Sequence, residues 1–104
     1  MSRVKKIGQI GEKLAKWKKN TQRINSLSKT AKYRIPDYLD HANGIIGEVK
    51  NVKKLSYTSQ IKDFMLYAED KGYQFILQVN KNTKLSGTIK KLVDEGKIFL
   101  VYLK

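Results

Sequence analysis

Apolar side chains recur along the chain at two spacings, and the longer spacing predicts three amphipathic helices. In residues 4–18 they return every three or four positions, which is the pattern of one helix face. A second stripe begins after an N-cap at Thr58 or Ser59 and continues through Lys71. The third, within residues 86–96, starts at a serine cap and closes at a glycine.

Shorter apolar runs between these stripes predict strands. They lie at residues 24–27, 33–39, 45–52, 73–79 and 98–103. Pro36 lacks a backbone N–H donor, so its side of the second run should lie at an edge, a bulge or a strand end. The resulting order is helix, strands, helix, strand, helix, strand. It predicts a fold of the α/β or α+β class with one mixed sheet and parallel crossovers.

A turn at residues 41–44 joins the second and third runs into a hairpin and fixes which side chains share a face. With a four-residue loop, Asp37 falls opposite Glu48, whereas a two-residue loop at residues 43–44 places Asp37 opposite Lys50. Either even loop puts Asp37, Glu48 and Lys50 on one face, because strand side chains alternate with a period of two.

Two carboxylates on opposed strand positions imply a bound cation or proton. Their Cβ atoms lie about 4.5–5.5 Å apart, a separation at which two negative charges repel strongly. Mg²⁺ prefers oxygen ligands and fits between such groups, while Lys50 on the same face could position water or stabilise charge on a phosphate. The face therefore suits metal-dependent phosphodiester hydrolysis, and a charged surface ladder is the alternative.

Charge points to a polyanionic partner. The chain has 22 Lys and Arg against nine Asp and Glu, a formal net charge of +13. Residues 1–35 hold eleven of the basic side chains and a single acid, Glu12. Nucleic acid is the usual partner of such a segment, with an anionic membrane or an acidic protein as alternatives.

Other composition features exclude several classes of protein. Cysteine is absent, which excludes disulfide scaffolds and thiolate zinc sites, and a single histidine cannot build a multi-histidine metal centre. No apolar run is long enough to span a bilayer, so we expect no membrane insertion by this domain. The 104 residues suit one domain.

Pro36-Asp37 followed by Glu48-Val49-Lys50 resembles the PD-(D/E)XK signature of restriction-endonuclease-like nucleases. Four longer segments narrow this resemblance: residues 33–37, 48–52, 55–61 and 82–86. They look like the restriction-endonuclease-type toxin domains found at the C-termini of bacterial polymorphic toxins, and the similarity extends over nearly the whole chain.

The resemblance implies a fold and a set of site residues. The core would be a helix, a β-meander, a helix and a strand, followed by an extra C-terminal helix and strand. Asp37 and Glu48 would bind the metal, with the Val49 carbonyl as a third ligand. Lys50 would position water or stabilise the transition state.

Two further residues match family positions that lie outside the signature motif. Glu12 corresponds to a first-helix glutamate that contacts metal through water, and Gln60 corresponds to a glutamine that points toward the site. The family also implies export as part of a larger toxin, action in the cytoplasm of a target cell, and a cognate immunity protein, which we expect to be acidic. On that reading residues 1–104 form a single toxin domain excised from a longer chain.

The favoured function is a Mg²⁺-dependent DNA endonuclease with little sequence preference, with Mn²⁺ as the alternative metal. An RNase of the same fold and a non-catalytic basic nucleic-acid-binding module are the alternatives. Asp40 and His41 are interpreted as turn residues, although a sole histidine also fits a metal-free ribonuclease. The expected phosphate contacts are Lys13, Lys16, Lys18, Lys19, Arg23, Lys53 and Lys54.

Overall fold

The computed structural model describes residues 19–103. The predicted first helix, and with it Glu12, Lys13, Lys16 and Lys18, lies outside the described residues. In chain order the elements are β1 (Ile24–Asn25), β2 (Tyr33–Arg34), β3 (Tyr38–Asp40), β4 (Ile45–Lys50), β5 (Lys54–Leu55), α2 (Ser59–Lys71), β6 (Gln74–Val79), β7 (Lys84–Leu85), α3 (Gly87–Asp94) and β8 (Phe99–Tyr102).

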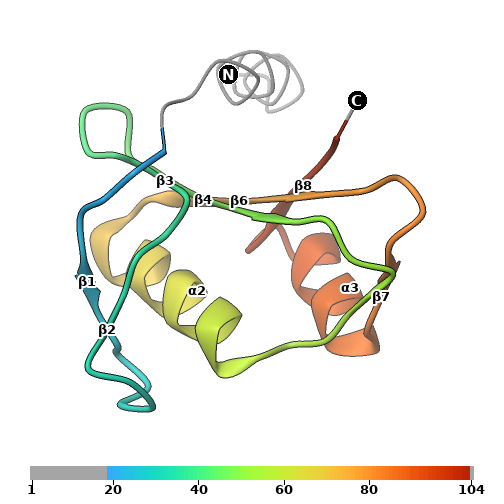
Figure 1. Ribbon diagram of the computed structural model, residues 1–104, viewed down its shortest axis with the longest axis horizontal. Coiled ribbons are helices and arrows are strands. Elements are labelled where there is room, and N and C mark those ends of the chain that lie inside the picture. The colour runs from blue at the N-terminus through green and yellow to red at the C-terminus, as the bar shows by residue number, and fades with distance from the viewer. Residues whose placement is uncertain (1–18, 104) are drawn as a thin grey trace.

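The main sheet is mixed and has the strand order β3–β4–β6–β8. β3 and β4 form the antiparallel hairpin, and β4, β6 and β8 run parallel to one another. The helices α2 and α3 are the crossovers between the parallel strands, and both lie on the same side of the sheet (Figure 1). The predicted α+β class and the parallel crossovers are therefore confirmed.

The prediction of a single sheet is wrong. β1 pairs with β2 antiparallel in a separate two-stranded sheet, and β5 pairs with β7 parallel in another. The expected run at residues 33–39 is divided because Pro36 lies between β2 and β3, where it removes a donor from the ladder. β5 and β7 arise where the chain leaves β4 and β6, in segments that sequence patterning assigned to loops.

Both helices of the described region begin at the expected hydroxyl caps. The backbone N–H of Ile61 donates to Thr58 Oγ1 at 3.2 Å, and that of Ile89 donates to Ser86 Oγ at 3.3 Å. α2 ends at Gly72, whose φ of 72° is left-handed and favours glycine. Within residues 19–103, neither helix is long and apolar enough to span a bilayer.

The core fills the space between the helices and the main sheet. Phe64 of α2 and Phe75 of β6 pack edge to face, with ring centroids 6.0 Å apart. Both are fully buried, together with aliphatic side chains of β4, β6 and α3. A smaller cluster centred on Ile45 and Ile76 lies on the opposite face of the sheet. The sheet that carries the hairpin is thus held by apolar packing on both faces.

A buried carboxylate, Asp63 of α2, fastens the β1–β2 segment to the helix. Ser26 Oγ donates to Asp63 Oδ2 at 2.6 Å, Arg34 Nε donates to the same oxygen at 2.8 Å, and the Ser28 N–H donates to Oδ1 at 2.8 Å. Burial alone would raise the pKa of Asp63, whose side chain is 0% exposed. The hydrogen bonds from Arg34, Ser26 and Ser28 outweigh burial and lower that pKa to about 2.

Asp63→Asn should destabilise the protein by about 3 kcal/mol near neutral pH, because it leaves the Arg34 guanidinium without its buried counter-charge. The folded-state pKa lies below the ordinary aspartate value of 3.8. The contribution of Asp63 is therefore present above that value and is lost as the pH falls toward 2. The difference in unfolding free energy between wild type and variant, measured by urea denaturation, should narrow over that range.

Asp70→Asn, at an exposed position on the same helix, is the matched control and should leave stability nearly unchanged. Equal destabilisation by Asp63→Asn at acidic and neutral pH would contradict the assigned charge of Asp63.

Candidate active site

The hairpin has the register that a four-residue loop predicts. Asp40 pairs with Ile45 and Tyr38 pairs with Gly47, so residues 41–44 form the turn. Gly44 has a φ of +67°, which the Asn43-Gly44 sequence favours. Asp37 immediately precedes β3, and extending the register by one pair places it opposite Glu48 of β4.

Asp37 and the strand opposite exchange two hydrogen bonds, each between a backbone N–H and a side-chain carboxylate. The N–H of Asp37 donates to Glu48 Oε1 at 3.0 Å. In return the N–H of Val49 donates to Asp37 Oδ2 at 2.9 Å. The two acidic side chains are consequently held beside each other by main-chain donors at the end of the hairpin.

Lys50 and Gln60 complete the cluster. Lys50 Nζ donates to Gln60 Oε1 at 2.6 Å and lies 3.4 Å from Glu48 Oε2. Gln60 is in the first turn of α2, so the crossover helix brings it to the strand that carries Lys50. The structure therefore brings together four of the residues that sequence reasoning assigned to the site: Asp37, Glu48, Lys50 and Gln60.

Glu48 occupies an electrostatically unfavourable position for a carboxylate. It is only 4% exposed, and burial together with the negative charge of Asp37 raises its pKa from 4.5 to about 7. The hydrogen bond from the Asp37 N–H and the positive charge of Lys50 act in the opposite direction without cancelling the effect. A buried acid beside a second acid is the arrangement that a cation would relieve.

The donor set fits a hard divalent cation. One oxygen of each carboxylate accepts a backbone hydrogen bond, so the oxygens that could bind a cation are Asp37 Oδ1 and Glu48 Oε2, the latter 3.4 Å from Lys50 Nζ. Mg²⁺ typically uses one or two protein carboxylates and keeps several waters. Among residues 19–103, no group of three or more His, Asp or Glu side chains suited to a metal occurs.

A cleft of about 640 Å³ adjoins this cluster and is lined with positive charge. Its walls include Lys50 and Gln60 of the site, together with Arg34 and Lys54. No acidic side chain lines it among the described residues. Sequence reasoning predicted Lys54 as a phosphate contact but missed Arg34. Asp63 gave no signal for this arginine, because it lies outside the predicted apolar stripe of α2 and its burial depends on contacts with the β1–β2 segment.

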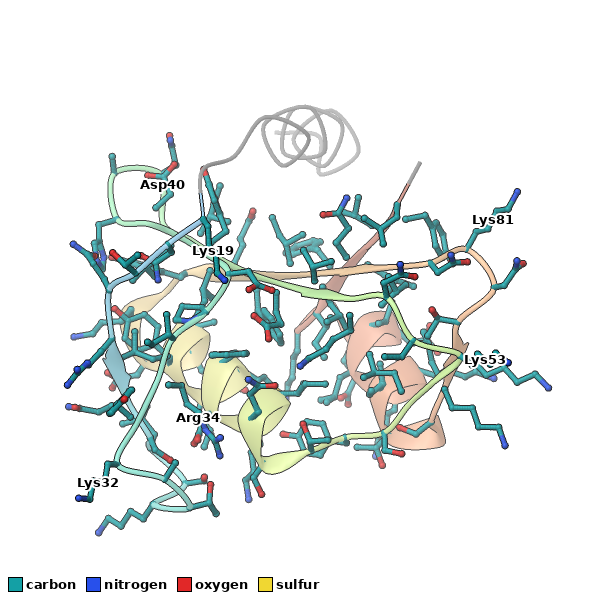
Figure 2. The ribbon with its side chains drawn as sticks, viewed as in Figure 1. Lys19, Lys32, Arg34, Asp40, Lys53 and Lys81 are labelled. Carbon is teal, nitrogen blue, oxygen red and sulfur yellow. The ribbon has the colours of Figure 1, made fainter. Side chains whose placement is uncertain are left out.

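The remaining predicted phosphate contacts lie elsewhere on the surface. Lys19 and Lys53 are exposed (Figure 2). Arg23 lies over the Tyr33 ring, 4.3 Å from its centroid, and lines a different pocket, of about 240 Å³, together with Asp70. That pocket is at the C-terminal end of α2, whereas the cleft lies at the N-terminal end.

Asp40 and His41 have the turn roles assigned to them. Asp40 accepts hydrogen bonds from the backbone and side-chain nitrogens of Asn43, at 3.0 and 2.7 Å. His41 Nδ1 lies 2.8 Å from the Tyr73 hydroxyl, which ties the turn to the start of β6. Both residues thus stabilise the hairpin at the end away from the acidic pair.

Comparison with known families identifies this architecture. The model of a family described as restriction endonuclease fold toxin 7 matches residues 8–89. The match covers well over half of the chain. The chain belongs to this toxin family. The matched span of restriction endonuclease fold toxin 7 includes the hairpin, Gln60, the cleft and β7. No curated protein and no solved structure gives a significant match.

In metal-free protein, Glu48→Gln should increase stability at alkaline pH. The pKa of Glu48 is raised in the folded state, so its contribution to stability is greatest below the ordinary glutamate value of 4.5 and falls as the pH rises to about 7. Glutamine keeps an oxygen for the Asp37 N–H but does not ionise. Melting temperatures in EDTA should therefore favour the variant progressively from about pH 5 to about pH 8.

Glu95→Gln, an exposed acid after α3, provides the control for the loss of one negative charge. A variant-minus-wild-type difference in melting temperature that does not change with pH would contradict the unfavourable environment assigned to Glu48.

Proposed function

We propose that this toxin domain is a Mg²⁺-dependent endonuclease that hydrolyses phosphodiester bonds in DNA with little sequence preference. The observation that carries the proposal is the joining of two carboxylates, Asp37 and Glu48, to Lys50 at the mouth of a cationic cleft. A pure binding module gains nothing from two acids beside a phosphate-binding surface. The family, toxins of restriction endonuclease fold, supports nuclease chemistry.

Asp37 and Glu48 would hold the ion, with the Val49 carbonyl as a third ligand. When bound, Mg²⁺ supplies Lewis-acid stabilisation of the negative charge that develops on a phosphodiester during attack by water. The backbone donors from Asp37 and Val49 orient the two carboxylates without any flexible side chain. Preorganisation of this kind reduces the reorganisation needed when a ligand binds.

Lys50 acts on the phosphate side of the same site. Its ammonium group is held by Gln60 Oε1 and by Glu48, and it also lines the cleft through which substrate would enter. A cation in this place stabilises charge on the non-bridging phosphate oxygens or orients the attacking water. Gln60 positions Lys50, because its amide oxygen is the closest acceptor to the ammonium group.

Sequence preference should be weak because the cleft offers contacts to phosphates. Lysine and arginine contacts of this kind fix the position of a nucleic acid but carry no base information. RNA is the competing substrate. The proposal further includes action in the cytoplasm of a target cell after export within a larger toxin, for which the family provides the support.

Replacing Asp37, Glu48 or Lys50 with alanine should each lower cleavage by about 100-fold or more, the usual cost of removing one transition-state contact. Gln60→Ala should lower it less, because it frees Lys50 without deleting it. Plasmid DNA and total RNA are incubated separately with each purified protein, in Mg²⁺, Mn²⁺ or EDTA, and the products are resolved on gels.

His41→Ala is the matched control and should keep full activity, since His41 belongs to the turn. Full activity of Glu48→Ala would overturn the site. Cleavage in EDTA that His41→Ala abolishes would instead support a metal-free ribonuclease, cleavage of RNA alone would assign the RNase function, and bound but intact nucleic acid would leave a binding module.

We also propose a cognate immunity protein, because a nuclease toxin must be silenced in the cell that produces it. We expect its contact face to be acidic, because the domain has a net charge of +13. Its association rate should fall steeply between about 50 and 200 mM salt, as measured by stopped-flow fluorescence. Glutamine at Lys16, Lys18, Lys19 and Arg23 together should slow association if those residues contact the partner. An unchanged rate would place the immunity contacts elsewhere.

A further inference from the structure

The β5–β7 pair carries lysines that neither the proposed chemistry nor the fold requires. Residues 51–58 and 80–86, the segments that contain these strands, hold four lysines and no acid. Lys53 and Lys81 lie at the same end of the molecule (Figure 2). Lys54 and Lys84 are register partners in the parallel pair.

Lys54 and Lys84 extend from the same face of that pair. Leu55 is buried and Leu85 packs against the main core, so the lysine beside each leucine faces the other way, toward solvent. Neighbouring strands are about 4.8 Å apart, and like charges directly opposite one another are destabilising. The pairing therefore imposes a repulsion that no acid within the two segments relieves.

Backbone interactions hold these lysines in place. The N–H of Lys84 donates to the Lys53 carbonyl at 2.8 Å, and the N–H of Ser86 donates to the Leu55 carbonyl at 2.9 Å. Thr83 Oγ1 donates to the Val52 carbonyl at 2.6 Å. The backbone pairing therefore fixes the positions from which the two lysine side chains extend.

This surface is continuous with the cleft of the active site. Lys54 is at once a member of the β5–β7 pair and a wall of the cleft that Lys50 and Arg34 also line. Arg34 uses two of its five N–H donors on Asp63 and Thr30, and the other three have no acceptor among the described residues. Arginine with unused donors is well suited to phosphate.

We propose that Lys84, Lys54 and Arg34 form one phosphate-binding track, which guides a nucleic-acid strand past Lys50. The track recognises the phosphodiester backbone, and Asp63 positions its arginine. The inference rests on the proposed nuclease function but concerns binding, which persists without metal. It also gives a role to residues 82–86, which sequence reasoning singled out without assigning a chemical role.

The test measures binding of a short fluorescein-labelled DNA duplex, and of a matching RNA strand, to the full chain in EDTA. For Lys54→Gln/Lys84→Gln, the slope of log K against log salt on the duplex should become shallower by about 0.9 for each lost phosphate contact. The unfolding free energy of this variant should be equal to or above that of wild type, because a repulsion is removed. Arg34→Lys should weaken binding without altering the net charge.

Lys71→Gln/Lys97→Gln is the matched control, since it removes the same charge near the C-terminal end of α2, where Lys71 lies about 18 Å along the helix axis from Ser59 of the cleft. It should leave the salt slope and the cleavage rate close to wild type. An equal change in the slope of log K against log salt in both double variants would show that binding depends only on net charge, and would overturn the track.

Unchanged nucleic-acid affinity in Lys54→Gln/Lys84→Gln, with normal wild-type binding and cleavage, would overturn the track alone and leave the nuclease intact. The lysine pair would then serve an acidic protein. Absence of nucleic-acid binding by the wild type would overturn the track and the proposed function together.

Discussion

The exchange of hydrogen bonds between Asp37 and the opposing strand is the constraint on which the rest of the site depends. Two backbone N–H groups, those of Asp37 and Val49, each bind a carboxylate, and so they hold Asp37 and Glu48 beside each other despite their like charge. Burial of Glu48 and the repulsion from the negative charge of Asp37 raise the pKa of Glu48 to about 7. Charge repulsion is opposed because the donors belong to the main chain of a hairpin that the core holds on both faces, so the acids cannot separate without losing these two hydrogen bonds.

Much of this arrangement is visible in the sequence because it follows from local rules. The turn at residues 41–44 fixes the register, the period of two then places Asp37, Glu48 and Lys50 on one face, and the structure has that register. Gln60 required the fold as well, since the crossover helix brings it to Lys50. The family match to restriction endonuclease fold toxin 7 supports the same architecture, whereas the roles of these residues stay predictions.

What the sequence did not reveal depends on contacts between distant segments. β5 and β7 are two residues long and show no periodicity, so only tertiary pairing identifies them and the expectation of one sheet failed. Asp63 resembled a helix surface residue, yet its partners Ser26 and Arg34 precede it by 37 and 29 residues. Net charge likewise indicated a polyanion without locating its contacts. Arg23 lines a separate pocket, while Lys54 reaches the cleft through a strand that composition could not predict.

Two pairs of like-charged residues, one acidic and one basic, are therefore connected to Lys50: Glu48 lies 3.4 Å from its ammonium group, and Lys54 lines the same cleft. Burial and the charge of Asp37 make the ionised form of Glu48 unfavourable in the free protein, and the register of β5 and β7 places two like charges on opposed strand positions. On the proposed function, a divalent cation would relieve the first repulsion and a phosphodiester backbone the second. Any ligand that binds the folded state alone stabilises it by mass action, so cation and nucleic acid together would stabilise the domain more than either does alone. On this view each ligand would gain affinity from the repulsion that it relieves, because the core keeps the hairpin and the β5–β7 pair in place before the ligand binds.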